Sequence, residues 1–251
     1  MKTGIVFSCY NIENKLDSSK LIQLLSNSEH YHFCFVNDCS NDNTNKILNS
    51  IIQKVPHRTS IINFEKKSGK SESLRAGISH LQKLSFINYI GFFNDIINYN
   101  FESIETMIEM LHSNENTSIV FGLEKKPNSF NIKEKHAILK LILKRCPFGK
   151  EMEGYLKLKN STMVFSKSIA PILFDKKFLS NHFFYLEILL RLKSIFGQNN
   201  SKKFIQTKEL KLVQPLVKPY SGLYQSINYS FLLIFFCINY RLFRNGYLLV
   251  R

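Results

Sequence analysis

The sequence lacks closely spaced cysteine pairs and an N-terminal secretory signal. Its cysteines form an odd set of five without a CxxC motif: Cys9, Cys34, Cys39, Cys146 and Cys237. This pattern is typical of reduced thiols and argues against a disulfide framework or a cysteine zinc site. The first apolar run, residues 5–10, is far too short for the hydrophobic region of a signal peptide. We therefore expect a cytoplasmic protein.

Two common nucleotide-binding fingerprints are also missing. There is no GxxxxGK[ST] motif of a P-loop, and no GxGxxG follows the first apolar run. Acidic residues are few, with 19 Asp and Glu against 34 Lys and Arg, and the net charge is +15. A charge of this size implies an anionic partner, which can be a phosphorylated ligand, an acidic membrane face or nucleic acid. Nucleic acid is unlikely because there is no compact arginine-rich arm or RNA-binding aromatic signature.

Short apolar runs alternate with amphipathic segments over the first 122 residues. The runs predict strands at residues 4–9, 33–36, 59–63, 88–93 and 118–122, and a less regular second half adds a strand near 162–165. The amphipathic segments predict helices between them, for example at 47–55 and 104–111, and a later helix at 183–196. This alternation predicts an α/β fold with a mainly parallel sheet flanked by helices, and an appended C-terminal helical part.

The chain is organised around residues 33–44, where an apolar strand ends in a polar loop before a helix. Asp38 follows the strand, and Asp42 or Asn43 can cap the helix. Ligands of open α/β sheets bind at this carboxyl edge of the strands. An ordinary turn is the alternative, since Asn, Asp and Ser also cluster in turns without a site.

Polar residues follow three of the predicted strands and would meet at one sheet edge. They are Asn11 after the first strand, Asn37 and Asp38 after the second, and Asn94 and Asp95 after the fourth. The loop and helix start at 67–77 add the cations Lys70 and Arg75. A glycine beside a helix start lets backbone N–H groups face an anion, and the helix N-terminus favours negative charge. Lys70 and Arg75 can equally be solvated helix residues.

In order and spacing these segments resemble the motifs of the family 2 glycosyltransferases, which have the GT-A fold. The family pattern runs PxYN, DDGSxDxT, NxGKxxAxxxG and DxD. Here the corresponding segments are residues 8–11 (SCYN), 37–44 (NDCSNDNT), 67–77 (KSGKSESLRAG) and 94–96 (NDI). Residues 184–187 (FYLE) resemble the FDxE segment of the dolichyl-phosphate glucose transferase branch.

The resemblance implies a glycosyltransferase that moves a sugar from a nucleotide-diphosphate sugar to a glycan or lipid-linked acceptor. It places the nucleobase and diphosphate contacts at Asn11, Asn37, Asp38, Lys70 and Arg75. It also places Asp95, with Asn94, near a Mn²⁺ or Mg²⁺ ion and the diphosphate, and Glu187 near the acceptor as the general base. These residue types suit the reaction, which needs a neutralised leaving group and a carboxylate that takes the acceptor's proton.

Several positions depart from the family pattern. Both carboxylates of DxD are replaced, by Asn94 and Ile96, so we expect weak metal binding. Asn37 stands where the family has the first aspartate of its pair. Glu187 has Arg191 four residues later, so an ion pair on a helix face also explains it. The alternative is therefore a non-catalytic relative that binds nucleotide or partners in glycan assembly.

The sequence predicts a transferase domain at 1–222 and an apolar, basic segment at 223–251. Within the segment, residues 231–238 are all apolar, and Arg241 and Arg244 follow them. A membrane-spanning helix needs about 20 mainly apolar residues, so this run is short for one. A core helix and an interfacial segment on an anionic membrane both fit, and we favour peripheral membrane contact slightly.

Overall fold

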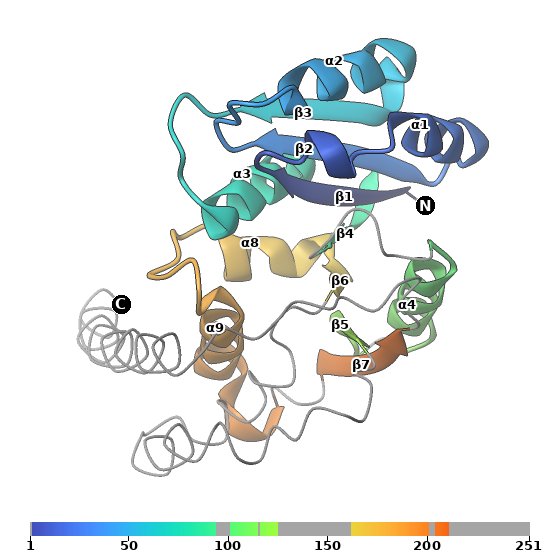
Figure 1. Cartoon of the computed structure of the whole chain (residues 1–251). Coiled ribbons are helices and arrows are strands. Elements are labelled where there is room, and N and C mark those ends of the chain that lie inside the picture. The colour runs from blue at the N-terminus through green and yellow to red at the C-terminus, as the bar shows by residue number, and fades with distance from the viewer. Residues whose placement is uncertain (1, 94–100, 115, 125–161, 201–203, 211–251) are drawn as a thin grey trace, which may run out of the picture.

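The computed structural model describes residues 2–93, 101–114, 116–124, 162–200 and 204–210. Its centre is a seven-stranded sheet in the order β3-β2-β1-β4-β6-β5-β7 (Figure 1). The strands are β1 (Lys2–Cys9), β2 (Tyr31–Asn37), β3 (Thr59–Asn63), β4 (Ile87–Phe92), β5 (Ile119–Glu124), β6 (Thr162–Ser166) and β7 (Ile205–Leu210). This is the predicted α/β architecture, with a mostly parallel sheet.

Helices cover both faces of the sheet. They are α1 (Ser18–Asn27), α2 (Thr44–Lys54), α3 (Lys70–Gln82), α4 (Phe101–Ser113), α8 (Ala170–Phe174) and α9 (Phe184–Asn200), with short 3-10 turns η1 (Glu13–Lys15), η2 (Pro56–Arg58) and η3 (Lys167–Ile169). No helix among the described residues has the length and apolar character needed to cross a membrane. The predicted segment 223–251 lies outside the described residues.

The structure differs from the prediction in the second half of the sheet. The five strands predicted in the first 122 residues all run in one direction, but β6 inserts between β4 and β5, antiparallel to both. Strand β7, which pairs in parallel with β5 at the edge of the sheet, was not predicted from the sequence. Its sequence, IQTKEL, lacks the apolar run by which the central strands are recognised.

Alternate side chains of the strands enter two separate cores. On β2, Val36 belongs to the core that includes residues of α3, α8 and α9, whereas Phe35 belongs to the core that includes residues of α1, α2 and α4. The period of two in a strand produces this division, because successive side chains point to opposite faces. The predicted apolar face of α3 is confirmed, since Leu74, Ile78 and Leu81 are fully buried.

Two glycines allow α3 to lie close against β1. A Cβ at Gly77 would collide with Val6, and a Cβ at Gly4 would come within 2.7 Å of Leu81. The absence of these side chains lets the helix axis approach the strand. The N-terminus of α3 is thereby brought to the carboxyl edge of the sheet.

Two neighbouring histidines, His32, which is buried, and His80, which is partly buried, lie at the opposite end of α3. His32 on β2 is only 6% exposed, and its Nε2 lies 2.8 Å from Ser60 Oγ. Within the described residues, His32 Nδ1 and His80 Nε2 have no hydrogen-bond partner. Burial, helped by the neighbouring His80, lowers the pKa of His32 from 6.5 to about 4. Burial also lowers the pKa of His80.

We predict that the protein loses stability in mild acid because of this pair. As the pH falls below 6.5, His32 becomes protonated in the unfolded chain, whereas in the folded protein it stays neutral until the pH reaches about 4. Since one pKa unit corresponds to about 1.4 kcal/mol, the loss should reach up to about 3 kcal/mol by pH 4. Urea unfolding from pH 7.5 to 4 measures it. His32→Gln should flatten the profile, whereas His30→Gln, at an exposed position, should not; equal slopes in both variants contradict this assignment.

Candidate functional site at the carboxyl edge of the sheet

Asp38 joins β2 to the turn that starts α3. Its side chain is almost fully buried, and its two oxygens accept the backbone N–H groups of Ser68 and Gly69 at 2.6 and 2.8 Å. Its own N–H donates to the carbonyl of Cys9 at the end of β1, at 2.8 Å. A carboxylate bound by two N–H groups is a strong fixed contact. Asp38 therefore holds three segments of the predicted site together.

Asn37 is buried beside Asp38 and connects the ends of β2 and β3. Its amide donates to Asn63 Oδ1 at 3.0 Å, and its Oδ1 accepts the N–H of Ser40 at 3.2 Å. Asn11 is exposed and has a positive φ of 48°, a conformation that asparagine tolerates better than most residues. Its Oδ1 accepts the N–H of Asn41 at 3.0 Å.

The loops after β1 and β2 are joined by further side-chain bonds. Asp42 accepts the N–H of Glu13 at 3.1 Å and that of Thr44 at 3.0 Å. The carboxylate of Glu13 in turn accepts the N–H of Asn43 at 2.6 Å. Asp42, rather than the N-cap Asn43, therefore bonds the first helical N–H of α2. These reciprocal bonds hold the loop after β1 and the loop after β2 together at the carboxyl edge of the sheet.

An aromatic side chain that the sequence analysis did not select also lies here. Tyr10 follows β1, and Lys67 Nζ lies 3.7 Å from the centre of its ring. Such a cation–π contact places a positive charge and a flat aromatic face beside Asn11. The tyrosine is part of the SCYN segment, so the motif was a signal that could have identified it.

The N-terminus of α3 carries the cations that were predicted to face an anion. Gly69 precedes the helix with φ of 90°, a conformation that favours glycine, and Lys70 is the first helical residue. Arg75, one turn further, forms two bonds with Glu72, at 2.9 and 2.6 Å. Arg75 also donates to the carbonyl of Asp175 beyond α8, at 3.3 Å. Arg75 thus connects α3 to the end of α8, and the two helices lie against each other (Figure 1).

Glu187 lies in the first turn of α9 and is 1% exposed. One oxygen accepts the N–H of Leu179 at 2.9 Å, and the other accepts from Arg191 at 2.8 Å. Burial raises the pKa of Glu187, although the bonds from Arg191 and Leu179 oppose the shift. The ion pair considered in the sequence analysis is therefore present. Both oxygens hold the connection between α8 and α9.

The predicted metal residues, Asn94 and Asp95, lie outside the described residues. Within the described part of the chain, no group of three or more His, Cys, Asp and Glu side chains could hold a metal ion. By sequence the two residues follow β4, whose carboxyl end is Phe92, next to β1 in the sheet.

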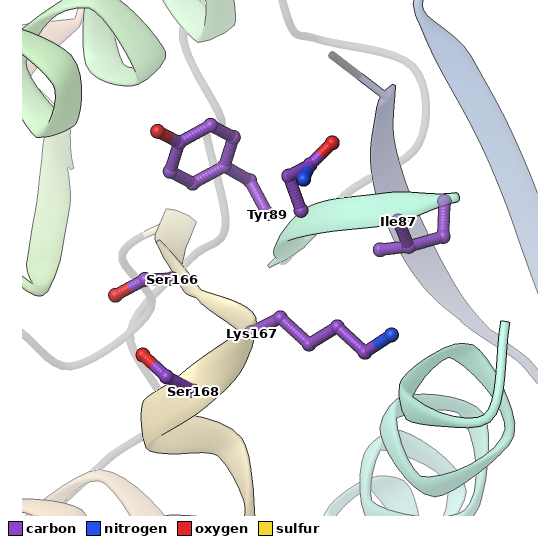
Figure 2. A pocket seen from close by; sticks show the side chains of 6 residues that line it. Ile87, Tyr89, Ser166, Lys167 and Ser168 are labelled. Carbon is purple, nitrogen blue, oxygen red and sulfur yellow. The ribbon is translucent and has the colours of Figure 1, made fainter. Parts of the chain in front are cut away.

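A hollow of about 540 Å³ lies at the other end of β4. Tyr89, Ser166 and Lys167 are among the residues that line it. Figure 2 shows that the side chains diverge, with Lys167 pointing away from Tyr89 and Ser166. The amine of Lys167 instead donates to the carbonyl of Leu84 at 2.7 Å. The polar side chains that line this hollow do not converge on one point, and the hollow lies at the opposite end of β4 from the carboxyl edge.

Similarity to solved structures defines the class of fold. Glucosyl-3-phosphoglycerate synthase from Mycobacterium tuberculosis, in complex with Mn²⁺, UDP and glucosyl-3-phosphoglycerate, has a TM-score of 0.62 at 13% identity over 87% of this chain and 73% of that one. Its complex with Mn²⁺ and UDP-glucose has a TM-score of 0.60 at 13% identity over 94% of this chain and 79% of that one. TarS from S. aureus has a TM-score of 0.51 at 15% identity, over 82% and 58% of the two chains. The fold is that of the GT-A glycosyltransferases.

The sequence places the chain within that class. The family profile described as Glycosyl transferase family 2 matches residues 5–177, which include the ends of β1 and β2 and the start of α3. The protein belongs to glycosyl transferase family 2. No protein with a curated description matches this chain.

We predict that Asp38→Asn destabilises the protein by about 1.5–3 kcal/mol, the usual contribution of a hydrogen bond to a charged group. The amide keeps one acceptor oxygen but turns an NH₂ group toward a backbone N–H. Urea unfolding measures the loss, and amide exchange at Ser68 and Gly69 should become faster. Glu65→Gln is the matched control, because Glu65 is an exposed acid of the same loop. Unfolding of Asp38→Asn at the wild-type urea concentration would contradict this role.

Proposed function

We propose that the protein transfers a sugar from a nucleoside-diphosphate sugar to a glycan or lipid-linked acceptor. The observation that carries the proposal is the convergence of the family motifs on one edge, where Asp38 joins the end of β2 to the N-terminus of α3. The positive end of the α3 dipole, with Lys70 as the first helical residue, favours an anion such as a diphosphate, while the N–H groups of Ser68 and Gly69 are already bonded to Asp38. The M. tuberculosis synthase with the same fold was solved with UDP and with UDP-glucose.

The proposed donor contacts follow from this placement. The nucleobase would lie near Asn11, Asn37 and Asp38, with the ring of Tyr10 as an aromatic face beside it. The diphosphate would lie toward Lys70 and the first turn of α3. The side chain of Asp38 already accepts two N–H groups, so its contribution includes the shape of the turn. Arg75 would lie toward the donor as an ion pair with Glu72, which largely neutralises its charge, so Lys70 would supply most of the positive charge.

We propose Asp95, with Asn94, as the residues that hold a divalent ion. Residues 94–96 offer one carboxylate and one amide oxygen, fewer charged ligands than the family pattern supplies. Mg²⁺ and Mn²⁺ commonly bind through one or two carboxylates together with substrate phosphates. The ion would therefore bind weakly by itself and mainly as a complex with the nucleotide, where it would offset the charge of the diphosphate.

The finer assignments also belong to the proposal. Residues 184–187 support a relation to the dolichyl-phosphate glucose transferase branch. The net charge of +15 and the apolar, basic segment 223–251 support contact with an anionic membrane on its cytoplasmic side. The same charge suits an acidic acceptor, and the M. tuberculosis synthase was solved with phosphoglyceric acid.

Binding and turnover of UDP-sugars test the proposed function. Calorimetry should show UDP binding that is stronger with Mn²⁺ than with chelator, and Asp95→Asn should reduce this difference. Transfer from UDP-glucose is measured with lipid-linked glycans and phosphoglyceric acid as acceptors. Failure to bind any nucleoside diphosphate would overturn the proposal. Metal-independent binding without turnover of any common sugar nucleotide would instead establish the non-catalytic alternative, which the fully bonded carboxylate of Glu187 favours.

We propose Glu187 as the general base, and two variants separate this role from its structural one. A base must take the proton of the acceptor hydroxyl, so Glu187→Gln should lower kcat by roughly 10²–10⁴ with little change in UDP affinity. Arg191→Lys disturbs the same ion pair but keeps the carboxylate, so kcat should fall much less. The acid limb of the kcat profile should lie above the ordinary glutamate pKa, because burial raises the pKa of Glu187. Equal kcat in both variants would show that Glu187 only holds the loop.

A further inference from the structure

A second side chain, from a distant part of the chain, holds the turn that Asp38 holds. Asn181 lies in residues 175–183, between α8 and α9, and is 110 residues from Ser71 in sequence. Its Oδ1 accepts the N–H of Ser71 at 3.1 Å and the hydroxyl of Ser71 at 2.5 Å. Its amide nitrogen lies 3.4 Å from the carbonyl of Ser68. The carboxamide therefore spans the first turn of α3.

The absence of a side chain at Gly69 makes this contact possible. A Cβ at Gly69 would collide with the Asn181 carboxamide. The turn is therefore bonded from two directions, by Asp38 from β2 and by Asn181 from the α8–α9 connection. The Asp38 bonds orient the N–H groups of Ser68 and Gly69, whereas the Asn181 bonds orient the next part of the turn.

The connection that carries Asn181 is itself anchored. Glu187 accepts the N–H of Leu179, two residues before Asn181. Arg191 donates to three carbonyls of the connection and of the end of α8, those of Leu173, Lys176 and Lys177. The guanidinium also lies 4.4 Å from the centre of the Phe178 ring. These contacts present Asn181 to α3 from a fixed backbone.

We propose that Asn181 is a positioning residue for the donor diphosphate. It fixes the first turn of α3, and with it the positions of the helix dipole and of Lys70 relative to the phosphates. The inference rests on the proposed function, because it takes the donor to bind at this edge. It adds a residue outside the match to the family profile, which ends at residue 177. The carboxamide is neutral, so it holds the turn without repelling an anion there.

Two substitutions of Asn181 distinguish this role from a purely structural one. Asn181→Ala removes the bonds to the turn, so UDP affinity should fall roughly threefold to tenfold while uridine affinity stays unchanged. Asn181→Asp keeps an acceptor for Ser71 but adds a negative charge beside the diphosphate. It should keep the wild-type amide exchange at Ser71, measured without nucleotide, and still lose at least as much UDP affinity as Asn181→Ala. In Asn181→Ala that exchange should be faster.

Ser180→Ala is the matched control. It removes a bond within the same connection, from the N–H of His182 to Ser180 Oγ at 3.1 Å, and should leave exchange and affinity unchanged. The inference is overturned if the wild type binds UDP and Asn181→Ala binds it equally well, if uridine and UDP lose equal affinity, or if Asn181→Asp binds UDP like the wild type. A wild type that binds no nucleoside diphosphate overturns the proposed function, and the inference with it.

Discussion

The carboxylate of Asp38 is the contact on which the geometry of this edge depends. It is buried, and it accepts two adjacent N–H groups from a segment about 30 residues further along the chain. Without these bonds, the partly buried N–H groups of the turn before α3 would lose their partners, and the buried carboxylate of Asp38 would be left unpaired, which is costly. The family resemblance predicts that Asp38 contacts the sugar donor. In the structure, the same carboxylate holds the turn beside which the donor is proposed to bind.

Close packing of α3 against β1 also helps to position this contact, because it fixes where the N-terminus of α3 lies. Glycines at positions 4 and 77 let the helix and strand approach each other, and the buried face of α3 fixes its rotation about its axis. The helix N-terminus can therefore be placed by the core, while side chains from β2 and from the α8–α9 connection set the turn in front of it. A site built in this way gains its precision from packing rather than from the exposed loops.

Two carboxylates of this protein, Asp38 and Glu187, are both buried but have different hydrogen-bond partners. Asp38 is surrounded by backbone donors, whereas Glu187 is balanced between burial, which favours its neutral form, and Arg191, which favours its charged form. An acid held in this balance suits proton transfer, and it also suits an ion pair that anchors a loop. The contacts of Glu187 show the anchoring role, because its two oxygens are bonded to different parts of one structural unit, whereas the proton-transfer role is the proposal.

Local patterns were sufficient to predict the five parallel strands, the apolar face of α3 and the polar edge with Asn11, Asn37 and Asp38, because side-chain periodicity and turn residues are properties of neighbouring positions. Only the tertiary structure showed that β6 inserts antiparallel between β4 and β5, since strand order depends on pairing between segments far apart in sequence. The partners of Arg75, Glu187 and Asn181 were also decided there. Asn181 has no local signal, because its contacts with Ser71 exist only after residues 110 apart have been folded together.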